Sequence, residues 1–315
     1  MTATPAIKLL ARWAIVCGGV LPALALAQAG ATAELSTSGL PCGSGTAIPA
    51  GSTTSVNATI TGGNGECTAT ATGFSYLGVT GSSASAMWNS TNGNSGGFSS
   101  GATSSWSDAI VPNWSGRFQV ENLSTLRLRF NVGANGTVSA AGSVIPGAGN
   151  PLASGSASIG YSFKFGSQQY AGFKTNSNGT ETIADGSTFG EITGTIDLAR
   201  LGTGTTYTFD PITLSMRSNS SASVTNWSNP GSRTANAQAN FANTLIWQGV
   251  VGAQAFDSDG KELVLPADFE VGLIGSQTGA DYWEAAVRQP VPEPGTWGLL
   301  LAGLGLLVAR ARRRG

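Results

Sequence analysis

Histidine is absent from this chain of 315 residues, and its absence excludes several kinds of active site. Ser-His-Asp and Cys-His hydrolases, zinc sites of the H-E-x-x-H type and histidine general bases all require an imidazole. Carboxylate pairs could still hydrolyse glycosides, and Glu181 with Asp185 or Glu191 with Asp197 are the candidates. Acids of this kind on a protein surface are usually solvated. We therefore expect a protein that is not an enzyme and needs no cofactor.

Charged residues are also scarce, at 10% of the chain, and they are unevenly placed. Residues 34–290 contain 10 basic and 16 acidic residues, which gives this region a net charge of −6. Binding of nucleic acid needs a cationic surface, so an acidic body argues against it. The remaining six basic residues lie near the two ends of the chain.

Helical periodicity is nearly absent between the two ends, where short runs of β-branched and aromatic residues alternate with polar ones. In residues 126–132, Leu126, Leu128 and Phe130 fall on one face while Arg127 and Arg129 fall on the other. This alternation predicts a half-buried antiparallel strand. Asn-Gly and Asp-Gly pairs predict tight turns between such runs. The pattern as a whole predicts an all-β fold, an antiparallel β-sandwich or a jelly-roll-like body.

The N-terminal 33 residues have the features of a signal peptide. Lys8 and Arg12 precede an apolar run from Trp13 to Leu26, and two small-residue cleavage sites follow, at residues 27–29 and 31–33. An uncleaved membrane helix is the alternative. Cleavage would leave Cys42 and Cys67, which we expect to form a disulfide in an oxidising compartment. Closing a loop of about 25 residues would contribute roughly 3 to 3.5 kcal/mol of stability.

The C-terminal 25 residues combine three features in a fixed order. The tripeptide Pro292-Glu293-Pro294 comes first, and a basic tail of Arg310, Arg312, Arg313 and Arg314 comes last. An apolar run between them predicts a transmembrane helix that includes Trp297, Leu299, Leu300, Leu301, Leu304, Leu306, Leu307 and Val308. At about 1.5 Å per residue this run reaches only about 20 Å of the roughly 30 Å bilayer core. Arginines directly after it predict a cytoplasmic C-terminus.

This segment, in the wording Val-Pro-Glu-Pro-Gly-Thr-Trp, resembles a PEP-CTERM sorting signal. The resemblance implies recognition by exosortase, a membrane-embedded cysteine transpeptidase-like enzyme of Gram-negative bacteria that make exopolysaccharide. The mature protein would then be released or transferred to the cell surface. An ordinary tail anchor is the alternative. Residues 243–261 and 274–282 also resemble the terminal strands that often precede this signal.

Composition suggests how the chain is divided. Residues 81–108 are dominated by Ser, Gly, Asn, Thr and Ala, which predicts a surface loop or linker. We therefore expect a signal peptide at 1–33, a small disulfide-bearing β module at 34–108, and a β-sandwich at 109–283. A linker at 284–290 and the sorting signal at 291–315 complete this division. A single domain is nearly as well supported.

Two weaker candidates for binding sites are present. The segment from Asp257 through Asp259 to Glu262 places three carboxylates around a glycine, which suits Ca²⁺, although an Asp-Gly turn explains the same residues without a metal. Trp106 and Trp114 lie near the polar stretch and could stack on sugars.

We therefore expect an exported protein of the cell surface or exopolysaccharide matrix, with the Sec translocon and exosortase as partners. A carbohydrate-binding module is the first alternative, and a carboxylate-dependent enzyme acting on glycans is the second.

Overall fold

A computed structural model describes residues 30–38, 55–62, 66–90, 95–114, 120–142, 153–201, 207–226, 233–266 and 271–285. These residues form sixteen strands, and all their pairings are antiparallel. The all-β prediction is confirmed. No helix long and apolar enough to cross a membrane occurs among the described residues, and both predicted membrane segments lie outside them.

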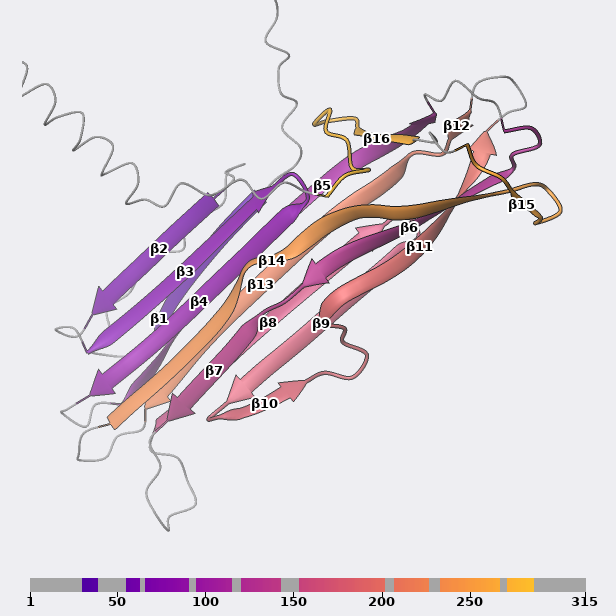
Figure 1. The fold of residues 1–315 in the computed structure, drawn as a ribbon. Helices are drawn as coiled ribbons and strands as arrows, with labels where there is room; N and C mark the ends of the chain where they lie inside the picture. The colour runs from indigo at the N-terminus through magenta and orange to yellow at the C-terminus, as the bar shows by residue number, and fades with distance from the viewer. Residues whose placement is uncertain are drawn as a thin grey trace, which may run out of the picture.

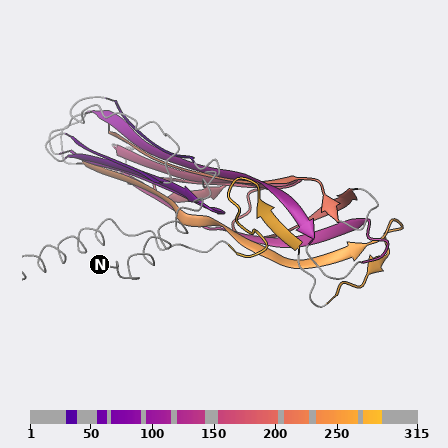
Figure 2. The ribbon, with the colours of Figure 1, turned by 90° about the horizontal axis from the view of Figure 1, so that it is seen from above.

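The strands pack as two layers elongated along the strand direction (Figure 1 and Figure 2). One layer consists of β1 (Gly30–Ser38), β5 (Gly96–Trp114), β8 (Ala153–Phe165), β9 (Gln168–Ser177), β10 (Thr180–Ile183), β12 (Thr208–Phe209), β13 (Ile212–Asn226) and β16 (Val271–Gly275). The other consists of β2 (Ser55–Gly62), β3 (Cys67–Tyr76), β4 (Val79–Ser90), β6 (Thr125–Ala134), β7 (Thr137–Gly142), β11 (Gly190–Leu201), β14 (Arg233–Phe256) and β15 (Glu262–Leu263). The last residues of β11 pair with β12 and connect the layers.

The expected turns join these strands. Asn135-Gly136 connects β6 to β7, and Asn178-Gly179 connects β9 to β10. Asn178 has φ 48° and Gly179 has φ 93°, the two left-handed residues that a type I′ hairpin turn requires.

The polar stretch at residues 81–108 corrects the sequence prediction, because it forms most of β4 and β5 instead of a loop. Its small residues alternate, and the inward ones are buried, including Ala84, Ala86 and Ala102. Low hydrophobicity misled the composition argument, since two sheets that approach closely can bury alanine and serine. The Ser82 hydroxyl of β4 lies 2.9 Å from the Ser220 hydroxyl of β13 in the opposite layer.

The predicted boundary at residue 108 does not divide the fold. Asp108 lies inside β5, and β4 pairs with β14 over most of its length. Therefore β3, which contains Cys67, and β4 belong to the same sandwich as the strands after residue 109. Residues 30–33, which we assigned to the end of the signal peptide, form the first four residues of β1.

Two kinds of core fill the sandwich. Alanine and serine dominate between β3, β4, β5 and β13, whereas aromatic rings dominate where β8 faces β6 and β14 of the other layer. Trp247 stacks on Phe163 at 6.1 Å and on Phe130 at 5.6 Å. Trp247 itself is fully buried.

Candidate functional site

A buried carboxylate anchors the end of the folded chain. Asp108 lies in β5, and its Oδ2 accepts hydrogen bonds from the Thr278 hydroxyl at 2.5 Å and from the Tyr282 hydroxyl at 2.9 Å. Its Oδ1 accepts a third from the backbone N–H of Gln277 at 3.1 Å. The Asp108 carboxylate is only 2% exposed, and these three hydrogen bonds offset the free-energy cost of burying its charge. We call Asp108, Thr278 and Tyr282 the C-terminal anchor.

The backbone beyond Tyr282 is held against β14. Trp247 donates from Nε1 to the Tyr282 carbonyl at 2.8 Å, and Val250 donates from its backbone N–H to the Trp283 carbonyl at 3.0 Å. Irregular pairing between β14 and β6 at residues 247–252 frees that N–H from the ladder. Gly249 has φ 87°, and a Cβ on it would lie 2.8 Å from backbone atoms of Glu284 and Ala285. The chain is thus fixed up to the end of the described residues.

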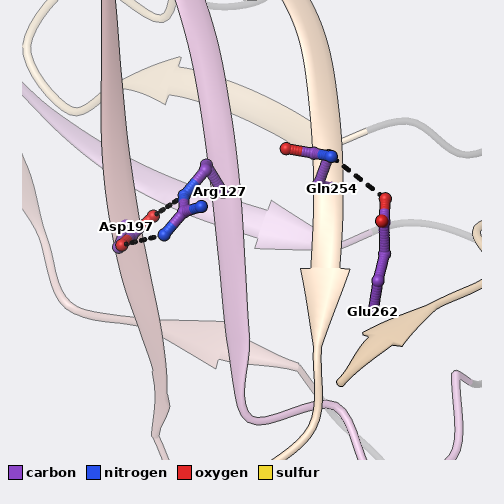
Figure 3. A network of polar contacts seen from close by, with 4 residues as sticks. All are labelled: Arg127, Asp197, Gln254 and Glu262. Atoms are coloured by element: carbon purple, nitrogen blue, oxygen red, sulfur yellow. Dashed lines mark hydrogen bonds and ion pairs between the residues drawn. The ribbon is translucent and has the colours of Figure 1, made fainter. Parts of the chain in front are cut away.

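A second site lies on the outer face of the other layer, where β6, β11, β14 and β15 lie side by side (Figure 3). Two adjoining hollows share Ala253 and Gln254 and have volumes of about 300 and 350 Å³. The first is lined by Arg127, Arg129, Thr195 and Gly252 as well, and the second by Glu262, Leu263, Val264 and Leu265. We call them together the outer groove.

Arg127 is neutralised at this site. Its Nε and one terminal nitrogen donate to the two carboxylate oxygens of Asp197 at 2.7 and 2.9 Å, as Figure 3 shows. The hydrogen bond from Arg127 lowers the pKa of Asp197, and the same bond raises the pKa of Arg127. The guanidinium also lies 4.9 Å from the centre of the Phe256 ring.

Arg129 is placed differently. It lies opposite Thr195 on β11 and Gly252 on β14, and a Cβ on Gly252 would lie 3.8 Å from the Arg129 Nε. Within the described part of the chain, Arg129 forms no ion pair. Periodicity predicted that both arginines face outward, and the structure confirms it. The carboxylate partner of Arg127 comes from the neighbouring strand β11. The sequence of β6 alone therefore does not show which of the two arginines is paired.

Of the predicted sugar-stacking pair, Trp106 does not lie on the surface. Trp106 is 1% exposed and packs on the Tyr282 ring at 5.4 Å, behind the C-terminal anchor. Its indole is therefore part of the core and has no face open to a glycan. The side chain of Trp114 lies outside the described residues.

The predicted calcium residues do not converge either. Asp257 accepts from the backbone N–H groups of Asp259 and Lys261 at 3.0 and 2.8 Å, so this carboxylate caps the turn between β14 and β15. Glu262 accepts from Gln254 Nε2 at 3.0 Å (Figure 3). No group of three or more metal-ligating acids or cysteines occurs among the residues that the structure describes. The turn explanation is the one that the geometry supports.

The candidate acid pairs are also engaged or far apart. Glu191 accepts from Asn131 at 2.6 Å, and Glu181 pairs with Lys174 at 3.3 Å. Glu191 and Asp197 lie on one strand six residues apart, which is roughly 20 Å at about 3.3 Å per residue. Glycosidase carboxylates lie about 5 to 9.5 Å apart, so these two cannot flank one glycosidic bond.

Two other predicted features fall mainly outside the described residues. Cys67 is disulfide-bonded, but Cys42 is not described, so their pairing stays a prediction. The motif Pro292-Glu293-Pro294, the apolar run and the basic tail Arg310–Arg314 also lie outside. Sequence reasoning did not find Asp108 or Tyr282 as a pair, because nothing local connects positions so far apart.

Comparison with known proteins bears on the C-terminal segment. The model of the PEP-CTERM protein-sorting motif matches residues 290–314. No curated protein and no solved structure matches the chain. The segment that begins five residues after the last described residue, Ala285, is thus a recognised sorting motif, and this protein is a PEP-CTERM domain-containing protein.

Proposed function

We propose that this protein is a non-enzymatic component of the cell surface or the exopolysaccharide matrix, delivered there by exosortase. The observation that carries the proposal is the PEP-CTERM motif at residues 290–314. The proposal includes export through the Sec translocon of a Gram-negative cell, guided by residues 1–33. After export, the C-terminal segment holds the protein temporarily in the inner membrane. The absence of histidine and the separation of Glu191 from Asp197 support a role without catalysis.

The C-terminal anchor gives this proposal a structural basis. Together with the backbone contact from β14, it holds the chain through Trp283, and only six residues lie between Ala285 and Pro292, which are seven Cα–Cα steps apart. Seven such steps span at most about 24 Å. A folded body on so short a connection stays beside the membrane while the tail is engaged, so the enzyme meets a motif in a defined position.

Replacement of Pro292, Glu293 and Pro294 by alanine tests the sorting. We expect the variant to remain in the inner membrane as the tail-bearing species, with the wild type processed and found outside the cell. Intact mass and cell fractionation measure both. The matched control replaces Val287, Arg288 and Gln289, three residues between the folded body and the matched segment, and we expect it to be processed normally. Unchanged processing of the Pro-Glu-Pro variant would refute the proposal.

The non-enzymatic role has a separate test. Incubation of the protein with polysaccharides should release no reducing sugar. Release that disappears on replacing one acid would overturn this part of the proposal and leave the sorting part standing.

A further inference from the structure

The outer groove combines one unneutralised cation with neutral polar groups. Arg127 forms an ion pair with Asp197, whereas Arg129 forms none within the described part of the chain. Thr195 lies opposite Arg129, and Gln254 uses its Nε2 on Glu262, which leaves its amide oxygen as an acceptor. A guanidinium with open N–H groups binds carboxylates in a bidentate manner.

The rest of the groove suits a sugar chain better than a peptide. β6 is paired with β11 on one side and β14 on the other over this stretch, so its floor has no free backbone groups for an added strand. Contacts must come from side chains instead. Ala253 and Val264 supply apolar surface, and Val264 is 92% exposed. A pyranose ring offers both an apolar face and hydroxyl groups.

Charge along the groove restricts the ligand further. Arg129 lines one hollow and Glu262 lines the other, so the two ends of the groove carry opposite charges. A carboxylate is favoured beside Arg129 and disfavoured beside Glu262. The body around the groove is acidic, with a net charge of −6 over residues 34–290, so it does not attract polyanions in general.

From these observations we propose that the outer groove binds a polysaccharide whose carboxylates are spaced by neutral sugars, with Arg129 pairing to one carboxylate. This binding goes beyond the sorting function, and the proposal does not depend on the result of the sorting experiment. Its site is also distinct from Trp106, which is buried.

Affinity electrophoresis and calorimetry on the full chain in an uncharged detergent test the proposal. The probes are hyaluronan, in which neutral and carboxylated sugars alternate, alginate, in which every sugar is carboxylated, dextran as a neutral polymer, and polyglutamate as an acidic peptide. We expect binding to hyaluronan, weaker binding to alginate, and none to dextran or polyglutamate.

Substitutions assign the binding to the groove. Arg129→Gln should weaken hyaluronan binding by about tenfold or more, the usual effect of losing a charge-assisted hydrogen bond. Arg217→Gln makes the same change of charge on an exposed residue of β13 in the other layer and should leave binding unchanged. Glu262→Gln should strengthen binding to alginate. Thermal unfolding checks that each variant folds.

Several outcomes would overturn the inference. Equal binding by the Arg129 and Arg217 variants would place the site elsewhere. Dextran bound as tightly as hyaluronan would remove the role of the carboxylate, and polyglutamate bound as tightly would identify an acidic peptide as the ligand. Binding to none of the four probes would reject the groove as a glycan site.

Discussion

The Tyr282 hydroxyl donates to Asp108 Oδ2 at 2.9 Å, although the two residues are 174 positions apart in the chain. Asp108 sits within β5, which pairs with β1, β12, β13 and β16. Tyr282 is among the last residues before the sorting segment. This bond therefore connects a strand of the sandwich body directly to the last described residues before the sorting motif.

Removal of this bond should loosen the end of the folded chain. Tyr282→Phe leaves Asp108 with one donor fewer in a buried position, and we expect a loss of about 1 to 3 kcal/mol in the free energy of unfolding. Urea denaturation measures it. Tyr170→Phe is the matched control, since the Tyr170 hydroxyl has no hydrogen bond to another described residue, although its ring packs on Phe130 and Phe163. A loss as large in the control would show that the bond to Asp108 is not the cause.

Gly249 tests the contact between β14 and the terminal segment. Gly249→Ala places a Cβ 2.8 Å from backbone atoms of Glu284 and Ala285 and forces φ 87° on alanine. We expect a loss of about 2 kcal/mol or more, because strain and a clash add together. Gly260→Ala has a similar φ of 79° and open space around it, so it should cost only about 1 kcal/mol.

Limited proteolysis separates these two effects. Cleavage at residues 283–290 should become faster in the Gly249 variant and stay at the wild-type rate in the Gly260 variant. The same rate in both variants would mean that the clash does not displace the terminal segment.

Stability should fall in strongly alkaline solution. Burial raises the pKa of Tyr161 to about 12, and it also raises the pKa of Tyr282. An unfolded tyrosine ionises near pH 10, so between about pH 10 and 12 the unfolded state loses protons that the folded state retains. The stabilisation from the protonated tyrosines is complete below pH 10 and is lost as pH rises through this window.

Urea midpoints between pH 8 and pH 12 measure this dependence. Tyr161→Phe should make the decline shallower, because it removes one of the two groups. A decline of unchanged slope in this variant would exclude Tyr161 as a contributor.

The exported protein should begin at Gly30. Residues Gly30–Ala33 pair with residues 102–105 of β5, so cleavage after Ala29 leaves the whole of β1, whereas cleavage after Ala33 removes four of its nine residues. N-terminal sequencing of the exported protein should read Gly-Ala-Thr-Ala-Glu. A sequence that starts at Glu34 would show that the second site is used and that β1 is five residues long.

Periodicity predicted several strands well, and composition failed at one place. The alternation in residues 126–132 and the Asn-Gly turns carry their own geometry, so β6 and the β9–β10 hairpin could be read locally. Residues 81–108 could not, because alanine and serine become a core only when an opposite sheet approaches closely. The 2.9 Å contact between Ser82 and Ser220 records that approach.

The sequence by itself determined that this protein carries a sorting motif, because the PEP-CTERM motif is a continuous segment whose features do not depend on folding. It also determined the all-β class, since a period of two residues is a local property. Only the tertiary structure decided which groups meet: Asp108 with Tyr282, Arg127 with Asp197, and Arg129 with an open groove. These relationships depend on the pairing of distant strands, and no local pattern in the chain encodes which distant strand becomes the neighbour.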